Sequence, residues 1–430
     1  MKKVTLVAFL AAMFAVVWGE AYQVNTLSTK QLGMAHTGAG LKLGAESMHF
    51  NPGGLGFLDS KVDASAGLSI IIPKVQFWNK NGHDMPENDP STPMYFYAAG
   101  NIKQLVSLGL SFTTPYGNSA SWDKNWDGAE LIQDISLKVF ALQPTVAFNI
   151  FNVVSIGAGP TINFGNFSLS KALIGKGMFP YPYNDISVAS VKLSGDADVA
   201  VGYNVGILYD AIPDKLAFGV AYRSKVKAKV SKGQAELDYA IPPQMQPALP
   251  MQVRILDKKA FEASLPLPAN MNIGVSFRPT EKLLFDFDLQ WVNWAAYDSL
   301  SVIFDLENMG KSTQTFPKGY ENTFAYRLGT QIALAENFDL RAGVYFDQTP
   351  VPDDFLNPET PSTNKLGVTA GGSFRPIPAL SINAAFLYAH GFNREGSCPA
   401  PIENIAPNRK FSGGYKVQAF VPSFGLSYKF

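Results

Sequence analysis

The chain has few cysteines and few charged residues for its length. Cys398 is the only cysteine among 430 residues, so an internal disulfide cannot form. Charged residues make up 16% of the sequence, compared with roughly 25% in ordinary soluble domains. Lysine plus arginine equals aspartate plus glutamate at 35 each, which leaves no basic excess for nucleic acid. The composition therefore argues against a disulfide scaffold and a nucleic-acid-binding protein, and a closed hydrogen-bonded sheet is one other source of stability.

Histidine is also scarce. The sequence contains four histidines, namely His36, His49, His83 and His390. None stands in a motif with a serine and an acid at a recognisable spacing, as nucleophilic or acid–base catalysis usually requires. Scattered histidines and one cysteine make no metal-ligand pattern either. We therefore expect no enzyme activity, no metal site and no cofactor.

Long apolar runs are missing after the N-terminus. The run over residues 4–18 follows two lysines, is too short for a comfortable membrane span, and precedes the small residues Gly19 and Ala21. This pattern predicts a secretory signal peptide over residues 1–21. No later run approaches the roughly 20 apolar residues of a membrane helix.

The mature sequence is dominated by alternation of apolar and polar residues. In LLFDFDLQW (283–291), apolar side chains take every second position and acidic or amide side chains lie between them. A period of two over about ten residues predicts a strand with one apolar and one polar face. The same pattern occurs in VDASAGLSIII (62–72), LVSLGLSFT (105–113) and FDLRAGVYFD (338–347).

The spacing of these strands distinguishes a membrane barrel from a soluble sandwich, which would show the same alternation. Short and long connections alternate along the chain. The short ones are 102–104, 150–152, 212–214, 279–281, 335–337 and 376–378, and the long ones are roughly 117–132, 168–190, 232–268, 294–322, 348–364 and 391–416. Tight periplasmic turns and long external loops are typical of outer-membrane barrels. The sequence thus predicts an all-β, 14-stranded antiparallel transmembrane β-barrel in the outer membrane of a Gram-negative cell.

The segment before the first strand is suited to irregular backbone. HFNPGGLGF (49–57) combines a proline, which cannot donate a ladder hydrogen bond, with glycines that disfavour helix and strand. A bore of fourteen strands is wide enough to leak unless something fills it. Irregular backbone is tolerated at membrane depth when it is buried in protein. We therefore expect residues 22–59 to form a hatch inside a barrel made by residues 60–430; an open general porin is the alternative.

Several stretches resemble the FadL/TodX (OmpP1) family of outer-membrane transporters for long-chain fatty acids and other hydrophobic compounds. They occur in the family's order over the whole mature chain: AYQ (21–23), NPG (51–53), PTVAFNIFNVVSIGAG (144–159), GYNVGILYDAIPDKLAFGVAYRSKVK (202–227) and RAGVYFDQTPVPDDF (341–355). Gly53 stands where the family's NPA motif has alanine.

The resemblance implies passive transport. A hydrophobic molecule would be captured by the external loops, enter a pocket in the barrel, shift the hatch and leave sideways through a kink in the third strand. Tyr22 falls where the family has an aromatic residue that touches the ligand, and an anchoring role is the alternative. Lys318 falls where the family has a basic residue for a ligand carboxylate, and a solvated loop lysine is the alternative.

The remaining implied site residues belong to the hatch and the third strand. Asn51, Pro52 and Gly53 form the hatch motif. Gly109 and Pro115 are the positions where the ladder of the third strand, roughly residues 105–116, is expected to break, although sheet curvature and loop geometry explain each residue equally well. The family's second basic residue has no counterpart in PTINFGNFS (160–168), which leaves neutral hydrophobic ligands open.

The expected partners are a hydrophobic small molecule and outer-membrane lipid, with no nucleic acid, and we expect a monomer. Apolar residues in the external loops, such as Trp122, Trp126 and Met251, suit a capture groove. They would equally suit packing on one another. A non-transporting barrel that serves as an adaptor of a protein secretion system is the alternative function.

Overall fold

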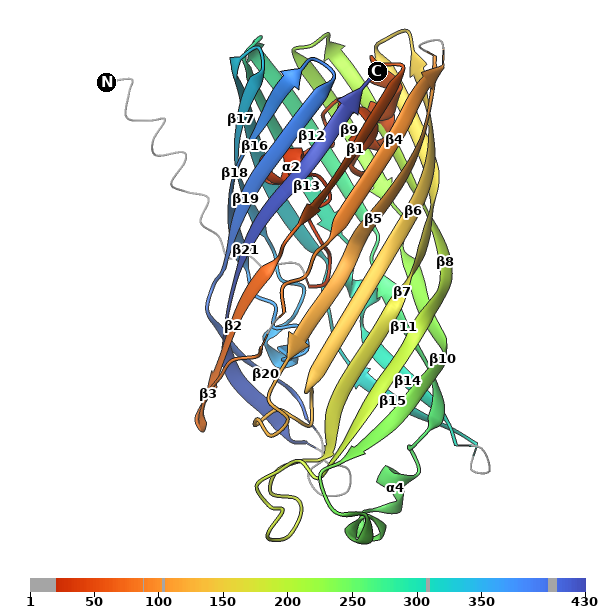
Figure 1. Ribbon diagram of the computed structural model, residues 1–430, viewed down its shortest axis with the longest axis vertical. Coiled ribbons are helices and arrows are strands. Elements are labelled where there is room, and N and C mark those ends of the chain that lie inside the picture. Colours follow the sequence, from red (N-terminus) through yellow and green to blue (C-terminus); the bar gives the residue numbers. More distant parts are fainter. Residues whose placement is uncertain (1–20, 88, 103–104, 307–309, 401–407) are drawn as a thin grey trace, which may run out of the picture.

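The computed structural model describes residues 21–87, 89–102, 105–306, 310–400 and 408–430, so the predicted signal peptide falls almost wholly outside the described residues. The described chain forms one closed antiparallel sheet (Figure 1). Strand β1 (Val62–Ser69) closes the ring by pairing with β21 (Lys410–Lys429). Within these ranges, no helix has the length and apolar character needed to cross a membrane.

The ring has 14 strands, which confirms the predicted number. Some of them consist of two consecutive segments: β1 with β2 (Ile72–Asn79), β9 (Leu216–Arg223) with β10 (Val226–Tyr239), β11 (Lys259–Leu267) with β12 (Asn270–Thr280), β13 (Leu283–Val292) with β14 (Ser299–Asp305), and β15 (Lys311–Pro317) with β16 (Thr323–Ala335). The others are β4 (Met94–Ile102), β5 (Val106–Ser121), β6 (Asp134–Ile150), β7 (Val154–Ile174), β8 (Ala189–Ile212), β17 (Phe338–Asp347), β18 (Lys365–Ile377), β19 (Leu380–Gly391) and β21. Two short strands, β3 (Gly82–Asp84) and β20 (Arg394–Pro399), extend the external loops.

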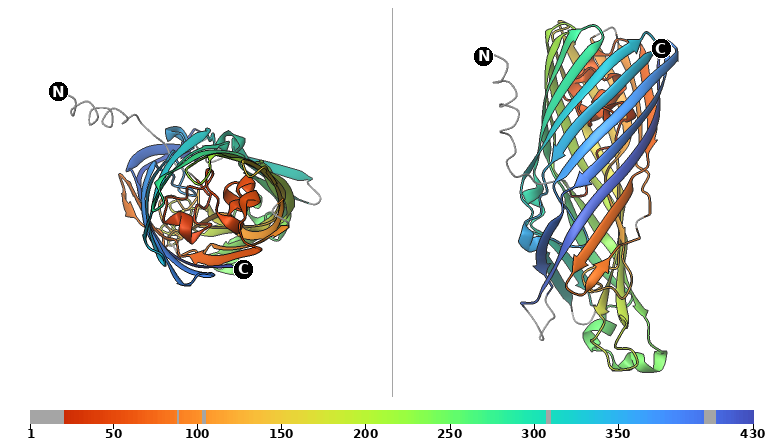
Figure 2. Two further views of the ribbon diagram at one scale, coloured as in Figure 1. Left: turned by 90° about the horizontal axis from the view of Figure 1, so that it is seen from above. Right: turned by 90° about the vertical axis from the view of Figure 1, so that its left-hand side faces the viewer.

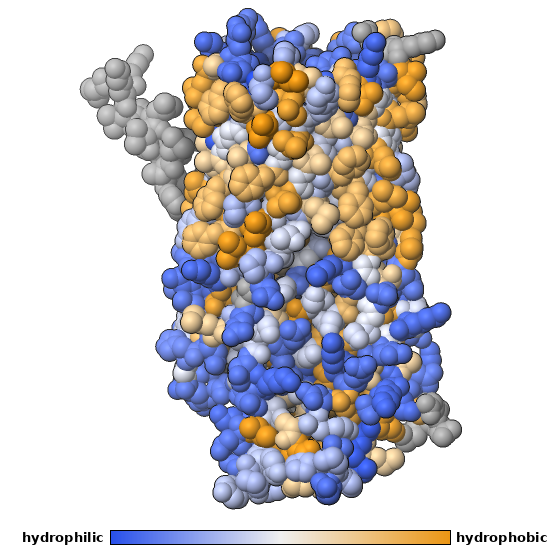
Figure 3. All heavy atoms as spheres, viewed as in Figure 1, coloured by the Kyte–Doolittle hydropathy of each residue, from blue (hydrophilic) through white to orange (hydrophobic). Residues whose placement is uncertain are grey.

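The predicted alternation sets the two faces of the wall. On β13, Phe285 and Phe287 are 40% and 45% exposed, whereas Asp286 and Asp288 are buried on the inner face. Figure 3 shows the resulting apolar surface over the half of the molecule that carries the C-terminus, with a hydrophilic surface over the other half. Such an apolar band is what contact with lipid requires.

The connections at the two ends differ in length as predicted. Short turns at residues 151–153, 213–215, 281–282, 336–337 and 378–379 join strands at the end next to the apolar band. The predicted turn at 102–104 lies mostly outside the described residues. The long connections gather at the opposite end, where the longest contains η3 (Pro243–Ala248) and α4 (Met251–Arg254) (Figure 1).

The connection predicted over residues 348–364 has those bounds in the structure, but others are shorter than the sequence predicted. The loop expected to start at residue 168 starts after Ile174, and the one expected from residue 232 starts after Tyr239. The wall therefore continues beyond the apolar band. There the outer face of each strand meets water instead of lipid, so the apolar alternation that marks a strand in the sequence weakens before the strand ends.

Residues 22–58 lie inside the ring, as the view along the barrel shows (Figure 2). They form four short helical segments, α2 (Thr29–Leu32), η1 (Gly44–Glu46), α3 (Ser47–Phe50) and η2 (Pro52–Phe57), and most of their side chains are buried. Short helices and the turns between them leave many backbone groups without intrahelical partners. Wall side chains satisfy several of them: Asp288 accepts the N–H groups of Gly38 and Ala39 at 2.7 and 3.0 Å, and Gln143 donates to the Met48 carbonyl at 2.7 Å.

Wall glycines let this inner segment approach closely. A Cβ atom on Gly219 of β9 would lie 1.7 Å from the Ala39 carbonyl oxygen, and one on Gly157 of β7 would lie 2.1 Å from the Pro52 carbonyl oxygen. Two short 3-10 helices of the outer loops, η4 (Trp294–Ala296) and η6 (Asp353–Phe355), border the interior farther from the membrane half. The inner segment and the wall are thus packed backbone against backbone in the membrane half of the barrel.

Candidate ligand cavity and its lateral wall

An apolar cavity of about 60 Å³ lies inside the outer half of the barrel. Its lining is mostly apolar and comes from β6, β7, β10, β11 and the loops above them: Tyr22, Ile135, Leu137, Val139, Phe167, Leu169, Ala228, Val230, Leu265, Tyr297 and Leu300, with Asn118, Lys138, Glu359 and Thr360 among the polar residues. Pockets that enclose drug-sized ligands usually measure about 300–1,000 Å³. A lipid-sized molecule therefore fits only if lining side chains move.

Tyr22 is both part of this lining and part of the inner segment. Its ring packs edge-on against Trp294 at 4.7 Å and against Tyr297 at 5.8 Å between ring centroids. Its hydroxyl donates a hydrogen bond to the Pro266 carbonyl. Tyr22 is 3% exposed, so the ring is held from several sides and its removal would enlarge the cavity.

The residues around Tyr22 also complete the barrel wall at β5. Pairing between β4 and β5 ends at Tyr95 and Thr113. Among the described residues ahead of β4, only Glu87 pairs with β5 again, in a single bridge to Ser121. In the interval, the inner segment pairs with this edge: Val24 N–H donates to the Pro115 carbonyl at 2.9 Å, and Gly117 N–H donates to the Tyr22 carbonyl at 3.0 Å.

A second cavity, of about 120 Å³, lies on the other side of these N-terminal residues, between β2 and β5. Its lining includes Ala21, Pro73, Val75 and Ala120. Asn118 and Thr360 line both this cavity and the apolar one. Residues 21–24 therefore stand between the interior cavity and an incomplete stretch of wall.

The third wall strand is irregular at only one of the two predicted positions. The register of β5 with β6 shifts between Thr113 and Tyr116, which includes Pro115. Gly109 pairs without interruption with Ala99 and Thr145, so the ladder does not break there, contrary to expectation. Gly109 instead makes room for the inner segment, because a Cβ atom would lie 2.5 Å from the Met48 sulfur. The strand also continues to Ser121, beyond the expected end near residue 116.

Lys318 is a buried residue and not a solvated loop lysine. Its side chain is 4% exposed, and its Nζ forms an ion pair with Glu359, a residue of the cavity lining. The same Nζ lies 6.0 Å from the centroid of the Tyr297 ring. Burial lowers the pKa of the Lys318 ammonium, but Glu359, Tyr320 and Cys398 together outweigh burial, and the pKa lies above its ordinary value.

A second lysine near this pair was missed by the sequence analysis. Lys171 lies near the end of β7, with its Nζ 4.5 Å from the centroid of the Phe316 ring. Burial lowers the pKa of Lys171, and Lys318 acts in the same direction while Glu359 opposes them. The sequence predicted that the fifth strand ends near residue 168, whereas β7 runs to Ile174, so Lys171 lies beyond the stretch in which a second basic residue was expected.

The NPG motif lies elsewhere and anchors the inner segment. Asn51 donates hydrogen bonds to the carbonyls of Ala39 at 2.7 Å and Ile207 at 2.9 Å, and its Oδ1 accepts the Gly53 N–H at 3.0 Å. Neither Asn51, Pro52 nor Gly53 lines the apolar cavity. A Cβ atom on Gly53 would lie 2.7 Å from the Leu208 nitrogen, which accounts for glycine in place of the family's alanine.

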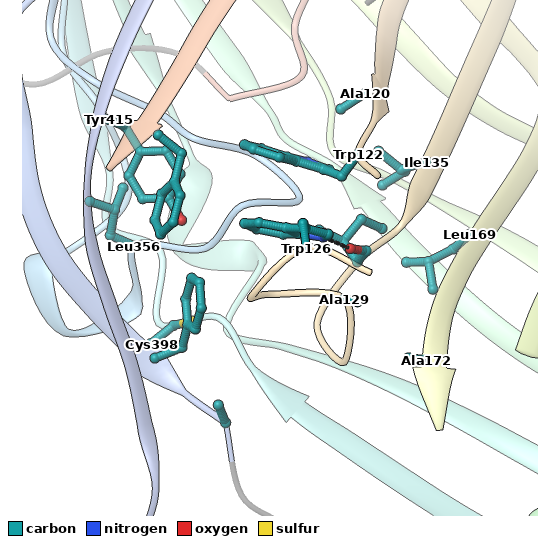
Figure 4. Close-up of a cluster of buried hydrophobic side chains, with 14 residues drawn as sticks. Ala120, Trp122, Trp126, Ala129, Ile135, Leu169, Ala172, Leu356, Cys398 and Tyr415 are labelled. Atoms are coloured by element: carbon teal, nitrogen blue, oxygen red, sulfur yellow. Dashed lines mark hydrogen bonds between the residues drawn. The ribbon is translucent and has the colours of Figure 1, made fainter. Parts of the chain in front are cut away.

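Trp122 and Trp126, both in the loop between β5 and β6, pack together and do not line the apolar cavity. Trp122 and Trp126 stack at 4.1 Å with an angle of 13° between their planes, next to Tyr415 and Cys398 (Figure 4). Trp126 also borders an open cavity of about 820 Å³ at the outer rim, whose lining mixes aromatic with charged residues. Its polarity suits a hydrophobic ligand less well than the apolar cavity does.

Comparisons with known proteins agree with this geometry. The family model described as outer membrane protein transport protein (OMPP1/FadL/TodX) matches residues 10–430. A long-chain fatty acid transport protein of Escherichia coli O6:H1 is 23% identical over 420 residues, covering 90% of this chain and 91% of that protein. The crystal structure of a Pseudomonas aeruginosa FadL homologue superposes with a TM-score of 0.82 at 19% identity, covering 96% of this chain and 100% of the other. That of the P. putida toluene transporter TodX gives 0.69 at 15% identity, covering 96% and 99%.

The two structural neighbours establish the barrel fold, and the family match establishes which family the chain belongs to. It covers nearly the whole chain, including the inner segment and all wall strands. The matched family consists of outer-membrane transport proteins, which does not favour the secretion-adaptor alternative. This chain therefore belongs to the OMPP1/FadL/TodX family of outer-membrane transport proteins.

Proposed function

We propose that this protein carries long-chain fatty acids or other hydrophobic small molecules passively across the outer membrane. The relatives named for their cargo span both chemical classes: one is a long-chain fatty acid transport protein and another a toluene transporter. The apolar cavity supports the same reading, because burial of apolar surface stabilises a bound ligand by about 25 cal/mol per Å².

In this proposal, residues 22–59 act as a hatch and the ligand leaves sideways. A molecule that enters the cavity displaces Tyr22, and the backbone on both sides of Tyr22 then leaves the edge of β5. The stretch of wall between β2 and β5 opens toward lipid. A water-insoluble cargo gains by moving along apolar surface into the membrane and does not need an aqueous bore. The pairing of β1 with β21 closes the ring with strands of one chain, and the monomer stays a prediction.

The observation that carries the proposal is the double role of Tyr22, whose ring lines the cavity and whose carbonyl accepts a hydrogen bond from Gly117 of β5. Cavity occupancy and wall closure are thereby linked through one residue. The phenyl rings of Phe112, Phe140 and Phe164 form a row on the adjacent strands β5, β6 and β7, with centroids 5.7 and 5.8 Å apart. The row lies next to Gly117 on the side of the membrane half. Such aromatic rows mark membrane interfaces, so the opening would lie at the outer edge of the lipid.

Uptake measurements test the function. The protein is expressed in Gram-negative cells that lack a transporter of this family, and uptake of oleate, toluene and a disaccharide is compared with cells carrying the empty vector. We expect faster uptake of at least one hydrophobic compound and no change for the disaccharide. Faster disaccharide uptake without any hydrophobic preference would indicate an open porin and contradict the proposal.

A further inference from the structure

Glu359 lies between the apolar cavity and the buried lysine behind it. Its side chain is part of the cavity lining and is 15% exposed, whereas Lys318 is 4% exposed and is not part of the lining. The Glu359 carboxylate and the Lys318 ammonium form a direct ion pair. A ligand in the cavity therefore meets the glutamate before it reaches the lysine.

The position of Glu359 is fixed by its backbone. Its N–H donates to Asn357 Oδ1 at 2.8 Å, and its carbonyl accepts a hydrogen bond from Asn118 Nδ2 of β5 at 2.9 Å. The next residue, Thr360, is hydrogen-bonded through its hydroxyl to the Tyr320 hydroxyl at 2.8 Å. The carboxylate is thus held at the cavity by ordered neighbours on both sides, and it is not a freely moving surface group.

The charges around the ion pair act on any ligand that carries a charge of its own. Lys171 and Lys318 both interact electrostatically with the Glu359 carboxylate. A carboxylate ligand would have to displace Glu359 from Lys318, lose its own hydration and leave Glu359 without its partner near an apolar cavity. Breaking a buried ion pair in this way is strongly unfavourable. A neutral ligand leaves the pair intact.

We propose that Glu359 determines specificity by occupying the site of a ligand carboxylate, so that the cavity favours neutral hydrophobic molecules over ionised fatty acids. This inference rests on the proposed function and narrows its substrate class. Selectivity of this kind arises from a resident group that competes with the wrong ligand, in addition to contacts that attract the right one.

Binding of a matched pair of ligands tests the inference. Full-length protein in lipid nanodiscs is titrated at pH 8 with dodecanoate and with dodecan-1-ol, which share one chain length, and tryptophan fluorescence reports binding. In the native protein we expect dodecanoate to bind no tighter than the alcohol. In Glu359→Gln we expect dodecanoate to bind at least tenfold tighter, equal to about 1.4 kcal/mol, with the alcohol changed by less than about twofold. Partition into lipid is the same for both variants and cancels.

Three further variants sharpen the test. Lys318→Met combined with Glu359→Gln should lose the gain for dodecanoate, because the ammonium that would receive the acid is gone. Glu359→Asp keeps the charge but moves it away from Lys318 Nζ, so we expect dodecanoate to bind about threefold tighter than in the native protein. This variant also tests the inference if Glu359→Gln fails to fold. Glu395→Gln is the matched control, since Glu395 accepts a hydrogen bond from Trp78 at 3.2 Å and does not line the apolar cavity; it should change neither affinity.

The outcomes separate this inference from the proposed function. Unchanged dodecanoate affinity in folded Glu359→Gln and Glu359→Asp, with the alcohol still bound, would overturn the role of Glu359 and leave hydrophobic transport intact. Absence of binding for both ligands in every folded variant would contradict the proposed function itself.

Discussion

The backbone N–H of Val24 donates a hydrogen bond to the Pro115 carbonyl over 2.9 Å, which makes the N-terminal segment a substitute for the missing neighbour of β5. Pro115 lies where the register of β5 with β6 shifts, so the wall strand is already distorted at this point. The ordered pairing of β4 with β5 has ended by then. The weakest stretch of the wall is therefore closed by the segment that also closes the cavity.

Tyr22 is predicted to hold this closure. Tyr22→Ala removes a ring buried among aromatic neighbours, which should weaken the docking of residues 21–24 by about 3 kcal/mol, or roughly a hundredfold. Hydrogen exchange of the Val24 and Gly117 amides, measured by mass spectrometry, should accelerate accordingly. Tyr22→Phe keeps the ring and loses only the hydrogen bond to Pro266, so it should exchange nearly as slowly as the native protein. Equal exchange in all three proteins would show that Tyr22 does not hold the segment.

Gly219 is predicted to be required for seating the inner segment. In Gly219→Ala the new methyl group would lie 1.7 Å from the Ala39 carbonyl oxygen, and backbone must shift to relieve the overlap. Overpacking of this kind costs about 1–3 kcal/mol. We expect residues 33–57 to become more sensitive to protease and ion current in planar bilayers to rise. Gly100→Ala is the control, because its Cβ would have no neighbour nearer than 3.4 Å; comparable effects in the control would contradict the role of Gly219.

Cys398 is predicted to be unreactive in the folded protein. Its side chain is buried in the cluster that contains Trp122, Trp126 and Tyr415, and burial raises the pKa of the thiol to about 12. The thiolate is the reactive form, so labelling by a maleimide at pH 8 should be slow until the protein is unfolded. Rapid labelling of native protein would mean that the loops around Trp122 and Trp126 open far more often than their packing suggests.

The sequence predicted the wall well and the site only in part. Alternation along single strands, such as 283–291, is local information and determines which face meets lipid. The alternation also predicted the number of strands. It did not predict where the strands end, because the outer face is no longer apolar outside the membrane. For the same reason Lys171 was not predicted, because it lies on β7 three residues beyond the predicted end of that strand.

Contacts between distant residues were out of reach. Tyr22 meets β5, and Lys318 meets Glu359, only after the ring has closed and the loops have folded inward. No local pattern marks either pair. The packing of Trp122 on Trp126 was left open for the same reason, since apolar loop residues suit a groove and a self-packed cluster equally well. The roles of Pro115 and of the NPG motif in transport stay predictions.

A reversible lock between the inner segment and β5 tests the central claim most directly. Gln23 and Tyr116 face each other in an antiparallel bridge. The hydrogen bonds Val24–Pro115 and Gly117–Tyr22 flank them, so they form a non-hydrogen-bonded pair. In such a pair the Cα atoms are about 4.5 Å apart, which suits a disulfide. In Gln23→Cys/Tyr116→Cys, uptake of the hydrophobic cargo should stop when the disulfide forms and recover on reduction, with the reduced protein as its own control. Equal uptake by the oxidised and reduced forms would contradict an account in which the N-terminal segment must leave β5 for cargo to pass.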